Sequence, residues 1–227
     1  MAFKKPSSVE DLRHFYDQEY SVQVIKDDDR AYSWMSAQLL KKYAAGKWLL
    51  DVGCGGGFLL KELQKFTPYT FGLDISQTAL RISQKTSPSS KLVQGSAENL
   101  PFHKNTFDSL ICLGSLEHFY DISIALGEFH RVVKPDGRII IMVPNSFWYK
   151  DILSVWQTGD IGERNQTYEF FATCTQWKTI ITQNQFKICQ VLKYNGISSN
   201  PAKQWLKDLL IPLNLSYHFI FLCQPIK

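Results

Sequence analysis

The sequence lacks any long apolar run. Its longest strictly apolar stretches, such as residues 139–143 and 219–223, fall far short of the ~20 residues that a membrane-spanning helix needs. The first residues, MAFKKPSSVEDLRHFY, are basic at the start but contain no apolar segment, so we do not expect them to act as a signal peptide. These absences predict a protein with no membrane span, and we expect a cytoplasmic location.

The sequence also lacks paired cysteines and a large net charge. The chain has five cysteines and no CxxC pair, which fits neither a disulfide framework nor a zinc site. The formal net charge is only +4, and Lys and Arg do not cluster in the way that a nucleic-acid-binding face requires. With 44% hydrophobic residues over 227 positions, the chain is instead typical of one large globular domain.

The central part of the sequence alternates between short apolar runs and helical stretches. This rhythm is typical of a parallel sheet that is covered on both faces. The expected strands are residues 48–52, 70–73, 91–94, 107–113 and 138–143. The expected helices between them are residues 57–66, 76–85 and 122–133, which supply the crossovers that parallel strands need. Residues 135–137 (PDG) predict a turn before the fifth strand.

Further elements flank this region on both sides. Ser8 followed by Asp11 predicts the start of a helix that runs to about residue 18, and the acidic run 27–29 predicts the start of a second helix, which ends at Gly46. After Pro144 we expect an aromatic-rich stretch at 147–156, a helix near 176–182, a short amphipathic helix within 201–213, and strands near 186–194 and 217–223.

The strongest local signal is a glycine-dense turn that follows an apolar strand, LLDVGCGGGF at residues 49–58. Glycines let the backbone turn with positive φ and approach a ligand closely. The spacing is not that of a dinucleotide site, because Phe58 stands where that motif needs its third glycine. It is not that of a phosphate-binding loop either, because that motif needs Lys directly after its last glycine and Phe58 follows Gly57. We therefore expect a small ligand that is neither a dinucleotide nor a triphosphate.

Asp74 closes the second expected strand and should face the same crevice as the glycine turn. A carboxylate at this place accepts hydrogen bonds from both hydroxyls of a ribose, which indicates a ligand that contains a nucleoside. Asp74 also precedes a helix that starts near Ser76, so it is a candidate helix cap. The two roles do not exclude each other.

Residues 47–144 resemble the class I S-adenosylmethionine-dependent methyltransferases, and among them the ubiquinone and menaquinone biosynthesis methyltransferases. The motifs that carry the resemblance stand in the family's order: residues 49–58, GLDIS at 72–76, GSAENLPF at 95–102, FDSLICLGSLEHF at 107–119 and LGEFHRVVKPDGRIIIMVP at 126–144. The resemblance implies an α/β fold that is Rossmann-like and doubly wound, with a mostly parallel seven-stranded sheet and helices on both faces. The late strands near Phe186 and Tyr217 would supply its antiparallel part.

The resemblance also implies the cofactor, S-adenosyl-L-methionine, and the product S-adenosyl-L-homocysteine. Carried over by position, Asp51, Gly53 and Gly55 would shape the pocket for the methionine part. Asp74 would hold the ribose, and Ile75 would lie against the adenine.

Three further residues carry over to the cofactor site. Ala97 and Glu98 would line the adenine edge, and Leu113 would supply backbone near the methionine end. Family members often have Asp before the Ala-Glu pair, whereas this chain has Ser96. A neutral hydroxyl is the weaker hydrogen-bonding partner, so we expect somewhat looser cofactor binding.

Methyl transfer from a sulfonium is an in-line displacement in which alignment supplies much of the rate. A hydroxyl acceptor must also lose its proton, and His118, just past the fourth expected strand, is our candidate base. The alternative is that Glu117 and His118 only begin a loop and bond to backbone. Two such residues are too few to specify a metal site, so no metal is predicted. Whether a base or a metal assists stays open at this point.

We expect one domain over residues 1–227, with an N-terminal helical cap or lid at 1–46, a cofactor-binding core at 47–144, and acceptor-side elements with the last two strands at 145–227. The aromatic residues Phe15, Tyr16 and Tyr20, together with the 147–156 stretch and the helix after residue 201, would close over the pocket. They favour a small aromatic or hydrophobic acceptor.

Two other functions remain as alternatives. One is a module that keeps the fold and binds the cofactor without turnover. The other is methylation of protein or nucleic acid, against which count the missing N-P-P-Y-type motif after the fourth strand, where the sequence reads LGSL, and the absence of a basic stripe. The sequence predicts neither the acceptor nor the oligomeric state.

Overall fold

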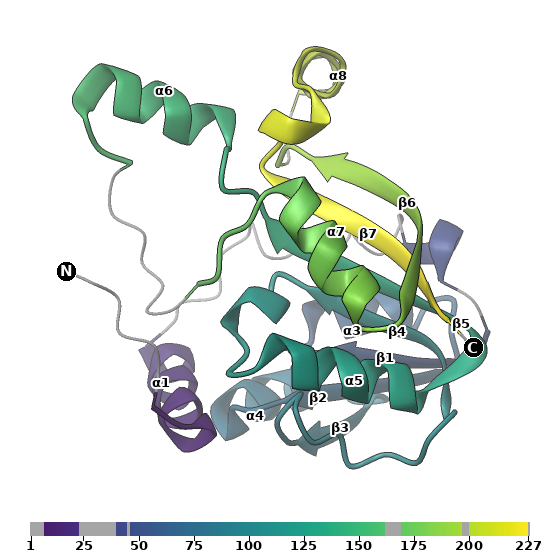
Figure 1. Ribbon diagram of the computed structural model, residues 1–227. Coiled ribbons are helices and arrows are strands. Elements are labelled where there is room, and N and C mark those ends of the chain that lie inside the picture. The colour runs from purple at the N-terminus through teal and green to yellow at the C-terminus, as the bar shows by residue number, and fades with distance from the viewer. Residues whose placement is uncertain (1–6, 23–39, 45, 162–168, 197–199, 227) are drawn as a thin grey trace.

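A seven-stranded sheet forms the centre of the protein, in the strand order β3-β2-β1-β4-β5-β7-β6 (Figure 1). The structure is a computed structural model that describes residues 7–22, 40–44, 46–161, 169–196 and 200–226. The strands are β1 (Trp48–Val52), β2 (Tyr69–Asp74), β3 (Lys91–Gln94), β4 (Phe107–Leu113), β5 (Val133–Pro144), β6 (Phe186–Tyr194) and β7 (His218–Pro225). The strand order changes direction between β1 and β4, the place where open α/β sheets form their ligand crevice.

The sheet is mixed rather than wholly parallel. The strands from β3 to β5 pair in parallel, whereas β7 runs antiparallel to both β5 and β6. Both late strands therefore occupy the places that the family resemblance implied. Near its start, β5 bulges: Phe107 of β4 pairs with Val133, and Ser109 pairs with Arg138. The predicted Pro-Asp-Gly turn lies in this bulge, within β5 rather than before it.

Strand side chains alternate between two apolar clusters, one on each face of the sheet. Leu49, Ile111 and Ile140 belong to a cluster with the buried Leu59 and Leu63 of α3 (Phe58–Leu63). Since the strands are buried on both faces, they read in the sequence as continuous apolar runs instead of an alternating pattern.

The second cluster covers the opposite face with α5 (Ile122–Val132) and α7 (Cys174–Gln183). Leu110 and Ile141 of the sheet meet Phe129 of α5 and Trp177 of α7 there. Trp177 is fully buried, and its Nε1 donates a hydrogen bond to the Pro144 carbonyl oxygen at 2.9 Å. Full burial of each large side chain contributes about 1.5–3 kcal/mol, so these two clusters hold the sheet and its helices together.

Polar side chains fix the starts of the covering helices. The hydroxyl of Ser76 accepts from the backbone N–H of Ala79 at the start of α4 (Gln77–Thr86), and Asp121 does the same for Ile124 in α5. Thr173 and Gln176 form a capping box on α7. Each such cap is worth about 1 kcal/mol.

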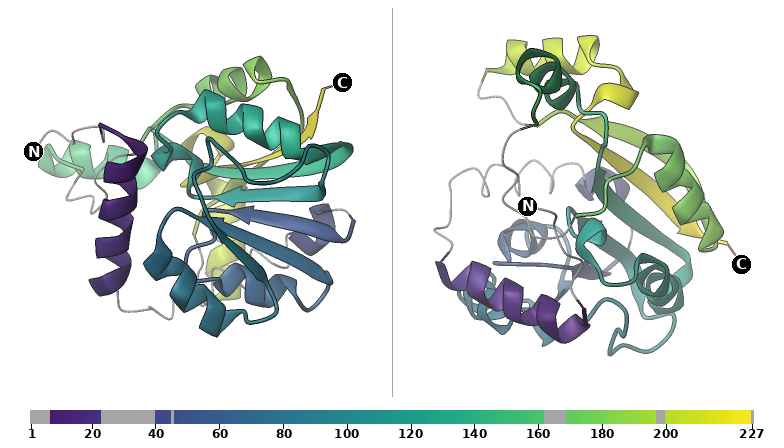
Figure 2. Two further views of the ribbon diagram at one scale, coloured as in Figure 1. Left: turned by 90° about the horizontal axis from the view of Figure 1, so that it is seen from below. Right: turned by 60° about the vertical axis from the view of Figure 1, so that its left-hand side comes forward.

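The first helix, α1 (Val9–Val22), stands beside the ends of the strands (Figure 2, left). The predicted cap is present, because Ser8 Oγ accepts from the Asp11 backbone N–H at 3.1 Å. Asp17 ties α1 to α4: its Oδ1 accepts from Ser76 Oγ at 2.7 Å and from the Thr78 backbone N–H at 3.0 Å. The predicted second helix lies largely outside the described residues, of which 40–43 are helical.

Two helices lie away from the covered sheet, at the top of Figure 1: α6 (Tyr149–Thr158) and α8 (Pro201–Leu210). We did not predict α6 from the sequence. It has no buried residue, and its Trp156 is 81% exposed. Within the part of the chain that the structure describes, no helix is both long and apolar enough to cross a membrane.

Candidate functional site

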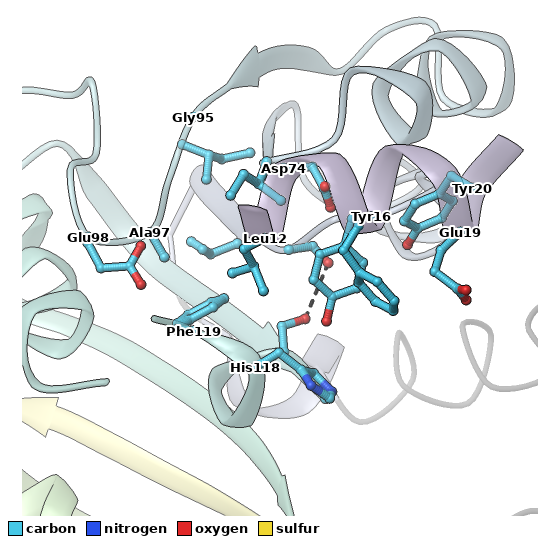
Figure 3. Close-up of a pocket in the computed structure, with 17 residues that line it drawn as sticks. Leu12, Tyr16, Glu19, Tyr20, Asp74, Gly95, Ala97, Glu98, His118 and Phe119 are labelled. Atoms are coloured by element: carbon cyan, nitrogen blue, oxygen red, sulfur yellow. Dashed lines mark hydrogen bonds between the residues drawn. The ribbon is translucent and has the colours of Figure 1, made fainter. Parts of the chain in front are cut away.

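A cavity of about 210 Å³ opens at the carboxyl ends of four parallel strands. Gly53 follows β1, Asp74 ends β2, Gly95 follows β3 and Gly114 follows β4, so each strand delivers backbone or a side chain to the same place. The far wall comes from α1: Leu12, Phe15, Tyr16, Glu19 and Tyr20. In Figure 3, Ala97 and Glu98 lie at one end of the cavity, and Glu19 and Tyr20 lie at the other.

The glycine turn after β1 is held tightly in place. The backbone N–H groups of Gly53 and Cys54 both donate to the Leu73 carbonyl oxygen, at 2.8 and 3.1 Å. Gly53 has φ 75°, and a Cβ there would lie 2.4 Å from Ser115 Oγ. Glycine is therefore required at this position by both conformation and space.

Asp74 is buried and accepts one backbone hydrogen bond on each carboxylate oxygen. The N–H of Gly55 donates to Oδ2 at 2.8 Å, and the N–H of Ser76 donates to Oδ1 at 2.9 Å. Burial raises the pKa of Asp74 to about 6, although these backbone N–H groups act in the opposite direction. The carboxylate thus braces the start of α4 and the glycine turn together, and it retains lone pairs that can accept from a ligand.

Three of the predicted cofactor residues do not line the cavity: Asp51, Gly55 and Leu113. Asp51 is 3% exposed, and burial, together with the charge of Asp74, raises its pKa to about 7. A Cβ on Gly55 would lie 2.5 Å from the hydroxyl of Tyr20, so this glycine leaves room for α1. Gly53, Asp74, Ile75, Ala97, Glu98 and His118 are brought together around the cavity as predicted.

At the end of the cavity beyond β3, the Ser96 hydroxyl is already engaged by Glu98. Ser96 Oγ donates to Glu98 Oε2, and Glu98 Oε1 accepts from the Asp121 backbone N–H at 3.2 Å. Because this chain has Ser96 where family members often have Asp, Glu98 is the charged group at this end of the cavity.

His118 stands in the 3-10 turn η1 (Leu116–His118) and lines the cavity. Its Nε2 lies 3.8 Å from Glu117 Oε1, and the Tyr16 ring meets the imidazole edge-on with centroids 6.3 Å apart. Burial raises the pKa of Glu117 to about 8. Burial also raises the pKa of Tyr16, helped by the charges of Glu117 and Asp74, so the phenol stays protonated.

Sequence reasoning missed several lining residues. Gly95 directly follows β3, and Gly114 and Ser115 follow β4, so their positions alone would have indicated them. Phe119 follows the 3-10 turn η1. Phe15, Tyr16 and Tyr20, which we expected to close over the pocket, do line the cavity. No lining residue comes from the described parts of α6 or α8.

Comparison with known proteins agrees with this geometry. Residues 50–141 match the family model of a methyltransferase domain. This match supports the resemblance to class I S-adenosylmethionine-dependent methyltransferases that the sequence motifs indicated. One solved structure with this fold is the S-adenosylmethionine-dependent methyltransferase of Mesorhizobium loti, with a TM-score of 0.65 at 15% identity over 87% of this chain and 99% of that one.

Two curated relatives show how far the similarity extends. The human arginine-hydroxylase NDUFAF5, mitochondrial, is 39% identical over 92 residues, which cover 40% of this chain and 27% of the relative. The demethylmenaquinone methyltransferase of Oceanobacillus iheyensis is 32% identical over 150 residues, which cover 60% of this chain and 63% of the relative. The chain thus spans less than two thirds of the length of each of these relatives.

Proposed function

We propose that this protein binds S-adenosyl-L-methionine in the cavity and transfers its methyl group to a small-molecule acceptor, leaving S-adenosyl-L-homocysteine. The observation that carries the proposal is the pairing of Asp74 with the glycine turn, since the Gly55 N–H donates to Asp74 Oδ2 at 2.8 Å. A single cofactor molecule would contact the glycine turn through its methionine part and the Asp74 carboxylate through its ribose.

The residues around the cavity suit the charge and shape of this cofactor. Three carboxylates line it, those of Glu19, Asp74 and Glu98. The cofactor carries a sulfonium and an ammonium, so nearby carboxylates favour it electrostatically. In our proposal Ile75 and Ala97 contact the adenine, Glu98 lies at its edge, and Asp51, Gly55 and Leu113 support the pocket from behind.

Methyl transfer needs an acceptor nucleophile in line with the sulfonium methyl group. When two reactants are held in that geometry, alignment supplies roughly 7–11 kcal/mol of the barrier reduction. We propose that α1 acts as a lid whose Phe15 and Tyr16 keep water from the sulfonium. His118 is our candidate for the residue that removes the acceptor's proton.

We propose an acceptor that is a small aromatic or hydrophobic molecule, because aromatic side chains of α1 form one wall of the cavity. A second candidate is an arginine side chain, favoured by the relative that is named an arginine-hydroxylase and by the carboxylates of the lining. A cytoplasmic location and a single domain over residues 1–227 complete the proposal.

Isothermal titration of the full chain with S-adenosyl-L-methionine tests the first step. We expect saturable binding that Asp74→Ala weakens severely, whereas the exposed Asp136→Ala leaves it unchanged. A wild-type protein that shows no heat with this compound contradicts the proposal. Release of S-adenosyl-L-homocysteine with phenolic, quinone, amine and arginine-peptide acceptors then separates an enzyme from a module that only binds the cofactor.

A further inference from the structure

A buried carboxylate lies next to the cavity just past the end of β4. Glu117 is 2% exposed, and its Oε2 is buried with no hydrogen-bond partner among the described residues. Gly114 lines the cavity, and a Cβ there would lie 3.9 Å from Glu117 Oε1. Since Gly114 has no side chain, the carboxylate lies within reach of a group bound at this end of the cavity.

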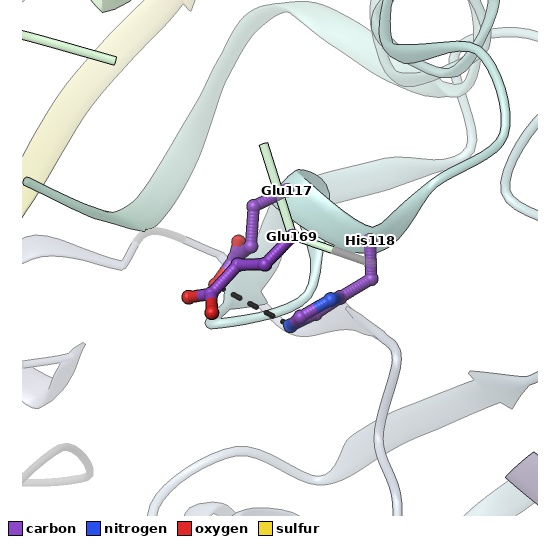
Figure 4. Close-up of side chains that lie close together, drawn as sticks. All are labelled: Glu117, His118 and Glu169. Carbon is purple, nitrogen blue, oxygen red and sulfur yellow. Dashed lines mark ion pairs between the residues drawn. The ribbon is translucent and has the colours of Figure 1, made fainter. Parts of the chain in front are cut away.

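A second carboxylate, that of Glu169, lies beside the first. One oxygen of Glu117, one oxygen of Glu169 and one ring nitrogen of His118 lie within 4.8 Å of one another. In Figure 4 the two carboxylates lie next to each other and face the imidazole ring. The sequence did not indicate this arrangement, because Glu169 is far along the chain and outside the five motifs.

Backbone contacts bring the two segments together. The Phe170 N–H donates to the Glu117 carbonyl oxygen at 2.9 Å, which places Glu169 beside Glu117. The Phe170 ring packs edge-on against the buried Trp177, with centroids 5.3 Å apart. The approach of Glu169 is therefore built into the packed fold.

The two carboxylates make this place favourable for a positive charge. Burial raises the pKa of Glu117, and the charge of Glu169 raises it further. A buried carboxylate is unfavourable unless a partner compensates its charge, and a like charge nearby adds repulsion. A cationic group that donates hydrogen bonds to both carboxylates would offset the two effects.

An aromatic ring stands beside the same carboxylates. The Tyr16 ring meets the His118 imidazole edge-on, with centroids 6.3 Å apart. The charges of Glu117 and Glu169 both contribute to the raised pKa of the Tyr16 phenol, so all three groups are close. Aromatic faces attract organic cations, and the carbon atoms attached to an ammonium pack well against them. Carboxylates and a ring together thus suit an ammonium group on an apolar molecule.

We propose that Glu117 and Glu169 bind the protonated amine of the methyl acceptor, while the rest of the acceptor packs against Phe15 and Tyr16 of α1. The inference rests on the proposed methyl transfer and narrows its acceptor to small amines with an aromatic or hydrophobic body. A neutral phenol or quinone of the same shape leaves the two carboxylates uncompensated and is therefore disfavoured.

The same arrangement suits the chemistry at nitrogen. A protonated amine has no lone pair, so one proton first passes from the nitrogen to the imidazole of His118. The freed lone pair forms the new bond to the methyl carbon. The bond from that carbon to sulfur breaks, and its electron pair stays on sulfur as the neutral thioether. The positive charge moves to the nitrogen, where Glu117 and Glu169 stabilise it as it develops.

Calorimetric titration of the full chain saturated with S-adenosyl-L-homocysteine measures acceptor binding without turnover. EDTA is present so that no metal ion occupies the carboxylates. The probes are 2-phenylethylamine, tyramine and tryptamine, each compared with the neutral alcohol that replaces its amine by a hydroxyl. In the wild type we expect at least one amine to bind at least tenfold tighter than its alcohol. This preference should fall at least tenfold in Glu117→Gln and in Glu169→Gln.

Two measurements show that such a loss is specific. Glu169→Gln removes a like charge and should not lower the thermal midpoint, so weaker amine binding in this variant does not come from unfolding. The control Glu10→Gln changes an exposed carboxylate of α1 that pairs with Arg13, and it should keep the full preference for the amine.

The proposal is overturned if no amine binds tighter than its alcohol to the wild type, or if Glu169→Gln keeps the wild-type preference. Titration with S-adenosyl-L-methionine separates this result from failure of the proposed function. Both glutamine variants should bind that cofactor within twofold of the wild type, whereas a wild type that does not bind it contradicts the proposed function itself.

Discussion

The backbone N–H of Gly55 donates to Oδ2 of Asp74 across 2.8 Å and joins the turn after β1 to the end of β2. The same carboxylate accepts from the Ser76 N–H at the start of α4. One side chain thus sets the relative positions of a turn, a strand end and a helix start. A change in its charge is expected to affect all three.

The affinity for S-adenosyl-L-methionine should depend on the charge of Asp74. Because the pKa of Asp74 is raised to about 6, the carboxylate becomes protonated as the pH falls through that value and loses its ability to accept from both ribose hydroxyls. We expect the affinity to fall below about pH 6, approaching tenfold per pH unit. Calorimetry between pH 5 and pH 8 measures this, and a flat profile would contradict the assigned role.

Gly53→Ala should disturb the cavity much more than an equivalent change elsewhere. The positive φ and the 2.4 Å approach of a Cβ to Ser115 Oγ leave no room for a methyl group. We expect at least a tenfold loss of cofactor affinity. Gly127 in α5 is the control, because a Cβ there meets nothing within 4 Å. Gly127→Ala should stabilise the protein by about 0.4–1 kcal/mol and leave binding unchanged.

Asp17→Ala tests whether α1 acts as a lid. The substitution removes both hydrogen bonds that tie α1 to the start of α4, to Ser76 and to Thr78. We expect faster release of the cofactor in stopped-flow measurements and about tenfold weaker binding, with little change in the thermal midpoint. Glu10→Ala, which removes an exposed pair with Arg13 on the same helix, should leave the release rate unchanged. Equal rates in all three proteins would show that α1 does not close the cavity.

His118→Ala should reduce turnover about a hundredfold or more while the cofactor affinity changes less than twofold. The exposed His103→Ala is the control and should keep full turnover. Equal losses of turnover and affinity would assign His118 a structural role.

The buried carboxyls of Asp51 and Asp74 should favour the folded state increasingly as the pH falls through the mildly acidic range. Burial raises the folded-state pKa of Asp51 to about 7 and that of Asp74 to about 6, above the ~4 of an unfolded carboxyl. Between about pH 4 and pH 7 these two groups therefore bind more protons in the folded state than in the unfolded state, and both lower the free energy of unfolding as the pH rises. The buried His218, whose pKa burial lowers to about 4, acts in the opposite direction. Each group contributes at most about 1.4 kcal/mol per pH unit.

Asp51→Asn should make this pH dependence less steep, because the variant no longer buries a titrating carboxyl at that position. Urea unfolding at several pH values measures the effect. Asp136→Asn, an exposed change in the bulge of β5, should leave the slope as in the wild type. An unchanged slope in Asp51→Asn would show that this carboxyl is charged throughout.

Local patterns in the sequence were enough to predict most of the sheet. The bounds of β1, β3, β4 and β6 agree with the prediction because their apolar runs end at polar or glycine residues. The helix α6 was missed for a physical reason. None of its residues is buried, so no packing against the core selects a helical pattern of apolar residues, and the helix does not stand out from the surrounding aromatic residues.

The cavity was predicted less completely than the sheet. Motif positions identified Asp74 and the glycine turn, because a single strand-turn-helix unit fixes them. The aromatic residues of α1 were expected at the cavity, whereas Leu12 and Glu19 of the same helix were not, because contacts between segments that are distant in the chain decide which face of α1 lies there. Local spacing carries no information about such contacts.

Among the described strands, β6 pairs with β7 alone, and β7 inserts between β6 and β5. During synthesis, β5 and β6 therefore emerge before the strand that joins them. Until residues 218–225 follow, both strands expose unpaired backbone edges, which promote association between chains. A nascent or truncated chain that stops before β7 would accordingly be prone to association, whereas β7 pairs with β5 and with one edge of β6 at once.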